Sequence, residues 1–316
     1  MDYILFKNRS YRGVISKGLG LYLTHFRLFF KASWLTAIVF ALVFAAMETL
    51  LSIQLPALSA TIMRQELVLK TALSPEVAQQ YLATLGITFF LILLYAVVEA
   101  LTAATVLNKL KEHHDANTMI VPKRWFAISR RMMGRTLKGY FFTFLNVMVP
   151  VLLIMVVVFV LHQLMPAASM TMMVVAGVLC ILLGLLYFPM LYVFMKYMMN
   201  KGKSYFSLLR SSYATGLRHW GHIFTTCLIG GLIVCVLAGI CCMPAIILAQ
   251  AHWISQEGVL NGDPQGMPDY INSLSFITYF LTGFVLVYLC MPILLIIYYM
   301  YGSIETYEQE KNKLDI

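Results

Sequence analysis

Six long apolar stretches constrain the fold of this chain more than any other feature. Each contains enough apolar residues to cross the hydrocarbon core of a bilayer as a helix, which takes about 20 residues. The stretches cover residues 33–53, 82–107, 141–164, 170–195, 223–250 and 274–300. They do not alternate apolar and polar residues, as the strands of a membrane barrel do. The sequence therefore predicts an all-α integral membrane protein with six transmembrane helices.

The positive charges predict the orientation of these helices. All Lys and Arg residues except Arg64 and Lys70 lie before the first span, between spans two and three, between spans four and five, or after the sixth. Because basic loops stay in the cytoplasm, we expect these segments and both termini to be cytoplasmic. The net charge of +9 then suits anionic lipid headgroups, and we expect no nucleic acid as a partner.

A short motif recurs at the start of three of the predicted spans. It reads HFRLFF (25–30), GYFFTF (139–144) and HWGHIF (219–224). Each copy follows a basic stretch in which apolar residues recur every three or four positions, which predicts an amphipathic helix. Such a helix lies in the plane of the membrane interface. The chain is therefore expected to be a single polytopic domain of three repeats, each with one surface helix and two spans. The repeats cover roughly 10–110, 120–200 and 203–303, and a cytoplasmic tail covers 304–316.

The predicted surface helices carry the residues expected to touch lipid headgroups. The tryptophans expected as interfacial anchors are Trp34, Trp125 and Trp220. The basic residues expected to contact anionic lipid are Arg124, Arg130, Arg131, Arg135, Lys203, Arg210 and Arg218. An alternative interpretation, in which His113, His114, His219 and His222 bind a metal ion, lacks a carboxylate motif of the HExxH kind. We predict no metal site and no cofactor.

Glu99 stands apart because it lies well inside the second span. A charged carboxylate near the bilayer centre costs about 3 kcal/mol or more. Its candidate partners are Tyr95, Asn146 and Lys196. Two interpretations stay open, a structural hydrogen bond between helices and a proton or cation site. Glu48, near the predicted outer end of the first span, is expected at the rim.

Small residues spaced four apart predict helix contacts, because close packing drives helix association in lipid. The first span carries Ala37, Ala41 and Ala45, and the fourth carries Ala176, Cys180 and Gly184. Prolines interrupt spans three to six, and we expect them to bend these helices unless neighbours supply the lost hydrogen bonds.

The chain resembles a broad bacterial family through the starts of its outward spans. The residues that carry the resemblance are YLTHFRLFFKASWL (22–35), RTLKGYFFTFL (135–145) and YATGLRHWGHIFTTCL (213–228). The family comprises uncharacterised six-span inner-membrane proteins and is similar to the membrane domain fused to some glycerophosphodiester phosphodiesterases. The resemblance implies a multi-pass protein of the bacterial plasma membrane and carries over no catalytic residue.

The sequence contains no nucleotide-binding GxxxxGK[ST] loop, no GxSxG elbow and no soluble segment long enough for a catalytic domain. We therefore expect a non-enzymatic membrane protein that organises or senses the bilayer, or a subunit of a membrane assembly. Its expected partners are membrane lipids, especially those with anionic headgroups, and a protein partner or a second copy of the chain stays open. The alternative function is a transporter, or a carrier of lipid or of a small amphipathic molecule, that uses Glu99.

Overall fold

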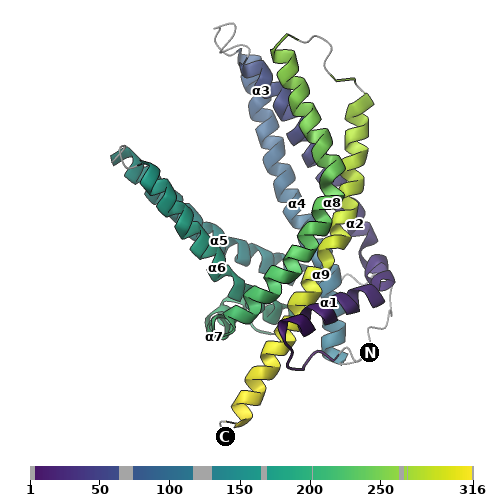
Figure 1. Cartoon of the computed structure of the whole chain (residues 1–316), viewed down its shortest axis with the longest axis vertical. Helices are drawn as coiled ribbons and strands as arrows, with labels where there is room; N and C mark the ends of the chain where they lie inside the picture. The colour runs from purple at the N-terminus through teal and green to yellow at the C-terminus, as the bar shows by residue number, and fades with distance from the viewer. Residues whose placement is uncertain are drawn as a thin grey trace. The chain divides into compact units, whose positions relative to one another are not determined.

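The described part of the chain is almost entirely helical. The computed structural model describes residues 4–63, 74–116, 130–164, 169–200, 202–262, 267–268 and 270–314, and these residues include no strand. Six helical segments are long and apolar enough to cross a membrane (Figure 1). They are Phe26–Met63, Pro75–Asp115, Arg130–Val160, Val174–Met199, Trp220–Val259 and Tyr270–Leu314. This confirms the predicted all-α membrane protein with six spans.

The helices are longer than the apolar stretches that predicted them. Their bounds are α1 Tyr11–Thr24, α2 Phe26–Thr49, the π-helix η1 Leu50–Gln54, α3 Leu55–Met63, α4 Pro75–Ala116, α5 Arg130–Leu164, α6 Ser169–Met199, α7 Tyr205–Arg218, α8 Trp220–Leu260 and α9 Tyr270–Leu314. At 1.5 Å per residue, the 45 residues of α9 span about 68 Å, roughly twice the thickness of the hydrocarbon core. The predicted tail 304–316 is, as far as Leu314, a continuation of α9.

The chain divides into two compact units that do not follow the predicted repeats. Unit 1 contains Met1–Phe29, Ala103–Leu232 and Pro292–Ile316, and unit 2 contains Phe30–Thr102 and Ile233–Met291. The helices α4, α8 and α9 therefore contribute one part to each unit, and the first turn of α2 belongs to unit 1 while the rest belongs to unit 2. The units are defined by spatial contacts, whereas the predicted repeats are consecutive in sequence. The two divisions differ because these long helices have residues in both units.

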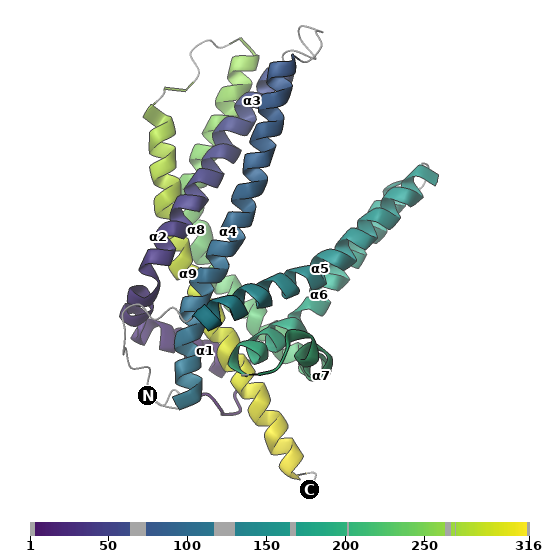
Figure 2. The same ribbon diagram turned by 180° about the vertical axis from the view of Figure 1, so that it is seen from behind.

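Unit 2 is a bundle formed by α2, η1, α3 and parts of α4, α8 and α9, which lie side by side in both ribbon views (Figures 1 and 2). Its core includes Ala45, Ala245 and Tyr279 from three different helices. Gly283 on α9 lies against Phe44, and a Cβ at this position would stand 2.7 Å from the Phe44 ring. The two helices approach closely because residue 283 has no side chain.

The two small-residue stripes behave differently. Ala37, Ala41 and Ala45 on α2 are fully buried, so this stripe is a helix contact as predicted. On α6, however, Cys180 and Gly184 are exposed, and the predicted contact there is wrong for the described residues. Small residues are compatible with a lipid-facing surface as well, so spacing alone does not distinguish the two environments.

Unit 1 is held together by buried tyrosines and by two glycine contacts on α9. Tyr192, Tyr205, Tyr298 and Tyr299 are among its largest fully buried side chains. A Cβ on Gly18 of α1 would stand 2.9 Å from the Cα of Ile296, and one on Gly302 would stand 2.7 Å from the carbonyl oxygen of Leu5. Both the N-terminal segment and α1 therefore pack directly on the second half of α9.

The helices α1 and α7 are built alike. Each has 14 residues, begins after a serine cap and ends at a histidine that directly precedes a membrane-spanning helix. The hydroxyl of Ser10 accepts from the N–H of Gly13, and that of Ser204 accepts from the N–H of Ser207. Such caps satisfy backbone donors that a helix start leaves free. The ending histidines are His25 and His219.

The third predicted surface helix does not follow this pattern. Residues 122–129 lie outside the described residues, and residues 130–138 belong to α5, which runs without a break into the apolar span. At the position of the two histidines stands Gly139, where a Cβ would meet Met198 and Phe194 of α6. This close contact joins α5 to α6, and the two helices lie side by side in Figures 1 and 2. Threefold repetition of the chain stays a prediction.

Candidate functional site

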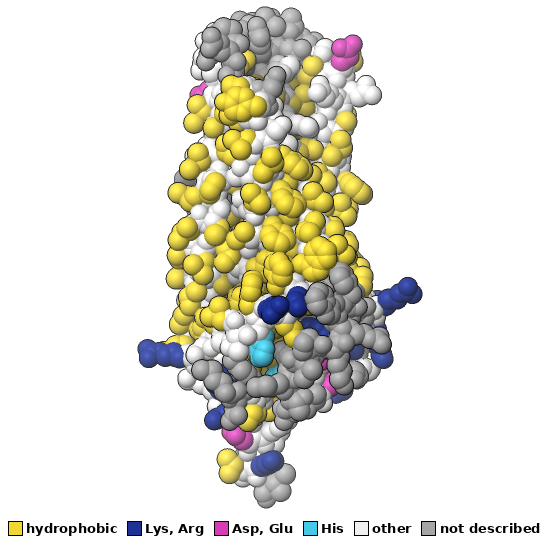
Figure 3. Space-filling model, turned by 90° about the vertical axis from the view of Figure 1, so that its right-hand side faces the viewer, with side chains coloured by type: hydrophobic (Ala, Val, Ile, Leu, Met, Phe, Trp, Pro, Cys, Tyr) yellow, Lys and Arg dark blue, Asp and Glu magenta, His cyan; other side chains and the backbone are white. Residues whose placement is uncertain are grey.

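Basic side chains are confined almost entirely to unit 1. Of the described Lys and Arg residues, Lys31 is the one that falls in unit 2. Figure 3 shows one face on which hydrophobic side chains gather over a large area and the Lys and Arg side chains lie outside this area. Unit 1 therefore contains the basic residues that could form a polar site.

The outer surface of α7 combines basic, hydroxyl and apolar side chains. Phe206, Ser207, Arg210 and Ser211 line a shallow depression. Arg210 is exposed, and Phe206 is 53% exposed. Further along the helix, Arg218 is exposed and lies 3.5 Å from the carboxylate of Glu308. A helix surface with cations beside exposed apolar side chains suits the interface between lipid headgroups and acyl chains.

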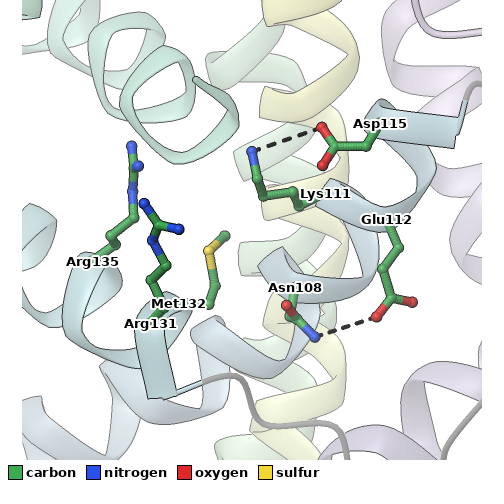
Figure 4. A pocket seen from close by; sticks show the side chains of 7 residues that line it. All are labelled: Asn108, Lys111, Glu112, Asp115, Arg131, Met132 and Arg135. Atoms are coloured by element: carbon green, nitrogen blue, oxygen red, sulfur yellow. Dashed lines mark hydrogen bonds and ion pairs between the residues drawn. The ribbon is translucent and has the colours of Figure 1, made fainter. Parts of the chain in front are cut away.

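A second polar feature is a pocket between the end of α4 and the start of α5 (Figure 4). Its volume is about 190 Å³, which is below the 300–1,000 Å³ usual for sites of drug-sized ligands. It is lined by Asn108, Lys111, Glu112, Asp115, Arg131, Met132 and Arg135. Figure 4 shows Arg131 and Arg135 beside each other on one wall and Lys111 with Asp115 on the other.

Two of the cations in this pocket cap the C-terminal end of α6. The guanidinium of Arg135 donates to the carbonyl oxygens of Tyr197 and Asn200, the latter at 2.6 Å. The ammonium of Lys111 donates to the carbonyl oxygen of Met199 at 2.5 Å. A helix leaves its last carbonyls without internal donors and carries partial negative charge there, so cations are favourable at this end. These contacts position α4 and α5 on the end of α6.

The carboxylates of the pocket already have cationic partners. Glu112 lies 3.0 Å from Lys109, and Asp115 lies 3.9 Å from Lys111. Arg131, in contrast, is exposed and forms no ion pair with any residue that the structure describes. The pocket therefore has unpaired positive charge on its α5 wall.

The basic residues predicted to contact lipid fall into three groups. Arg130, Arg131, Lys203, Arg210 and Arg218 are exposed, whereas Arg124 lies outside the described residues. Arg135 is half-buried, and its guanidinium binds the carbonyls of α6. Sequence reasoning did not separate Arg135 from its neighbours, because an Arg that caps a distant helix has the same local pattern as an Arg that faces headgroups.

The predicted tryptophan anchors also differ from one another. Trp34 is 38% exposed, as an anchor in the lipid interface requires, and Trp125 lies outside the described residues. Trp220 is half-buried, donates from Nε1 to the carbonyl oxygen of Leu185 at 2.9 Å and stacks on Phe224. Its described contacts thus fix the start of α8 against α6, which its sequence neighbourhood did not predict.

The candidate partners of Glu99 have other contacts. Lys196 lies 2.6 Å from Glu305, and the amide of Asn146 donates to the carbonyl oxygen of Phe142 at 2.7 Å. Glu99 is exposed, has Tyr95 and Cys290 as neighbours and forms no hydrogen bond or ion pair within the described part of the chain. The structure therefore shows no interhelical hydrogen bond from Glu99.

The helix that contains Glu48 is longer than the predicted first span. It continues beyond Glu48 through η1 and α3 to Met63, and the expected position of Glu48 at the rim of the bilayer stays a prediction. Glu48 is half-buried and, like Glu99, is a neighbour of Tyr95. The continued apolar character of residues 55–63 was the signal for a longer span.

The π-helix η1 ends before Pro56, which has no N–H to donate to the carbonyl of residue 52.

Two of the four histidines considered as metal ligands, His113 and His219, bind groups on α9. The Nδ1 of His113 lies 2.8 Å from the hydroxyl of Tyr298, and the Nε2 of His219 lies 2.7 Å from Glu308. Within the described residues, no three His, Cys, Asp or Glu side chains come together as a metal ion requires. These histidines therefore connect α4 and the start of α8 to the second half of α9.

Tyr205 and Arg9, which lie outside the membrane-spanning helices, have pKa values shifted by burial. Burial raises the pKa of Tyr205, whose hydroxyl lies 2.9 Å from that of Thr143, and the phenol remains neutral. Burial lowers the pKa of Arg9, and the nearby Tyr299 opposes this effect. Arg9 keeps its charge because a guanidinium does not lose its proton in proteins.

Comparison of the chain with protein-family models, with curated proteins and with solved structures gave no match. The resemblance to the bacterial six-span family therefore stays a prediction, and function has to be inferred from the geometry above.

Proposed function

We propose that this chain is a non-enzymatic, multi-pass membrane protein that organises or senses the bilayer by binding anionic lipid headgroups. The observation that carries the proposal is the common construction of α1 and α7. Each is a capped helix joined directly to a membrane-spanning helix, and each exposes an arginine together with apolar side chains. On α1 these are Arg12 and Leu23, and on α7 they are Arg210, Phe206 and Leu217.

The physical chemistry of this arrangement favours anionic lipid. Each Lys or Arg near an anionic membrane surface contributes about 1 kcal/mol of attraction, and exposed apolar side chains add burial in the acyl region. A direct connection to a membrane-spanning helix keeps α1 and α7 at the bilayer surface at all times. Binding then selects among lipids that are already present and does not recruit the protein to the membrane.

The same proposal includes an orientation and a location. An even number of spans places both termini on one side, and the concentration of basic residues near the termini favours the cytoplasm. The bacterial plasma membrane is proposed from the family resemblance alone. A role as a subunit of a larger assembly is compatible with this arrangement, because α5 and α6 expose much apolar side-chain surface, including Phe159 and Ile181.

The test is the lipid composition around the purified full-length protein. The protein is extracted into nanodiscs from membranes containing equal amounts of phosphatidylglycerol and phosphatidylcholine, and the retained lipids are measured by mass spectrometry. We expect enrichment of phosphatidylglycerol, which the triple variant Lys203→Gln, Arg210→Gln, Arg218→Gln reduces.

A matched control variant replaces Lys311 and Lys313, in the last turn of α9, with neutral residues. Lys311 directly follows Glu310, and Lys313 lies three residues after it, so a negative charge lies beside both and we expect this variant to retain the enrichment. Equal retention of the two lipids by the unaltered protein contradicts the proposal. If a second polypeptide is extracted with the protein in a constant ratio, the protein is a subunit of a larger assembly.

A second candidate function, a carrier of lipid or of a small amphipathic molecule, is favoured by the carboxyls of unit 2. Glu48 and Glu99 come from different helices and share Tyr95 as a neighbour, and Glu99 is exposed within an apolar span. A carrier is supported by a retained molecule that the Glu99→Gln variant loses and the Glu76→Gln variant keeps. Retention of the molecule by the unaltered protein and by both variants counts against a carrier.

A further inference from the structure

The pocket between α4 and α5 has two arginines that form no ion pair with a carboxylate of the described residues. Its two acidic groups are already offset, Glu112 by Lys109 and Asp115 by Lys111. Arg131 and Arg135 lie close enough for their charges to act on each other. Two neighbouring cations without a counter-charge repel one another, and this repulsion is stronger near a protein surface than in bulk water.

Arg135 also has a donor that the fold leaves unused. Its terminal nitrogen donates to two carbonyls of α6, but its Nε is buried and has no hydrogen-bond partner in the described structure. A buried donor without an acceptor costs about 1–3 kcal/mol. An anion in the pocket both accepts hydrogen bonds and offsets the repulsion between the two guanidinium groups.

We infer that this pocket binds a phosphate group, with Arg131 as its principal ligand and Arg135 and Lys111 as supporting cations. A guanidinium matches the geometry of phosphate oxygens and forms paired, charge-assisted hydrogen bonds with them. The phosphate belongs to a phospholipid headgroup or to a soluble molecule. This inference extends the proposed function. It rests on that function where it takes a lipid headgroup as the source of the phosphate.

The size and lining of the pocket limit what enters it. About 190 Å³ suits a phosphate with a small substituent, so acyl chains of a lipid stay outside. The amide of Asn108 is a further donor on the α4 wall, and Met132, which is 4% exposed, is the apolar part of the lining. Glu112 and Asp115 oppose an anion, so removing one of these charges is expected to strengthen binding.

The experiment compares three substitutions in the full-length protein. Arg131→Gln removes the principal ligand, and this residue is exposed, so the fold does not depend on it. Arg130→Gln is the matched control, because Arg130 is the adjacent residue of α5, is exposed and does not line the pocket. Asp115→Asn removes an opposing charge. Arg135 is left unchanged because it caps α6.

Binding is titrated in detergent with two probes. Native mass spectrometry counts bound phosphatidylglycerol, and thermal stabilisation reports inorganic phosphate. We expect one saturable site whose affinity falls about tenfold or more in Arg131→Gln, the effect of one charge-assisted hydrogen bond. Arg130→Gln is expected to stay within about twofold of the unaltered protein, and Asp115→Asn to bind more tightly, because a like charge near the anion is removed.

The outcomes separate this inference from the proposed function. Competition between the two probes, or binding of phosphatidylglycerol alone, supports a headgroup site. Binding of inorganic phosphate alone supports the pocket with a soluble ligand and excludes a lipid headgroup as its source, whereas the lipid proposal itself depends on the enrichment of phosphatidylglycerol in nanodiscs. Equal losses in Arg131→Gln and Arg130→Gln overturn the inference and leave general binding to a basic surface. The absence of any saturable binding by the unaltered protein overturns it as well.

Discussion

The indole Nε1 of Trp220 donates to the carbonyl oxygen of Leu185, whose usual helical donor would be the N–H of residue 189. Residue 189 is a proline inside α6 and has no N–H. The first residue of α8 thus supplies the hydrogen bond that the proline removes. Gly216 of α7 lies against the same proline, where a Cβ would stand 3.0 Å from the Pro189 carbonyl oxygen. Together these contacts fix the junction of α7 and α8 on the bend of α6.

The Trp220→Phe variant is expected to lose about 1 kcal/mol of stability, because the Leu185 carbonyl is left without its donor. In a Pro189→Ala background the N–H of residue 189 is available to this carbonyl, so the same substitution is expected to cost less. Thermal unfolding of the four proteins in one detergent measures the coupling. An equal loss in both backgrounds contradicts this account of the bend.

Two glycines of α1 are expected to respond in opposite directions. A Cβ on Gly18 meets the backbone of Ile296, whereas a Cβ on Gly20 meets no atom within 4 Å. Gly18→Ala should therefore destabilise unit 1, and Gly20→Ala should be neutral or raise stability by up to about 1 kcal/mol through helix propensity. Hydrogen exchange of the N-terminal segment and α1 tests this pair. Similar exchange in the two variants would show that α1 does not pack on α9 as described.

The ion pair between Lys196 and Glu305 is expected to matter for stability, because both side chains are mostly buried, at 21% and 18% exposure. The hydroxyl of Tyr192 adds contacts of 2.6 Å to Glu305 and 3.1 Å to Lys196. Lys196→Met leaves a buried carboxylate with a single neutral donor, which should cost about 1–3 kcal/mol. Adding Glu305→Gln should recover part of this loss. Additive losses in a double-mutant cycle would exclude the coupling.

The Glu99→Gln variant is expected to be as stable as the unaltered protein or more stable. The carboxyl has no hydrogen bond to lose in the described structure, and its charge is costly within an apolar span. Glu76→Gln on the first turn of α4 is the control, and a small loss is expected because an acidic side chain is favourable at a helix start. Clear destabilisation by Glu99→Gln would restore the interpretation of Glu99 as a structural hydrogen-bonding residue.

Much of the membrane architecture follows from local sequence properties. The free energy of moving a residue from water into lipid is nearly a property of that residue, and a helix satisfies its own backbone hydrogen bonds. A window of sequence therefore contains most of what decides whether a segment spans the bilayer. Glu48 shows the limit of such a window, because the helix that contains it continues through η1 and α3 to Met63, beyond the apolar stretch that predicted the span.

The sequence by itself determined the six spans and the segregation of basic residues, because each depends on neighbouring residues or on composition. Only the tertiary structure decided the roles of individual polar residues. Arg131 and Arg135 are neighbours in sequence, yet one is exposed and the other caps α6. Lys196 pairs with Glu305, and Trp220 with Leu185, because folding brings distant segments of the chain within hydrogen-bond distance. A hydrogen bond or an ion pair acts over a few ångströms, so its partner is set by the packing of the helices and not by the surrounding sequence.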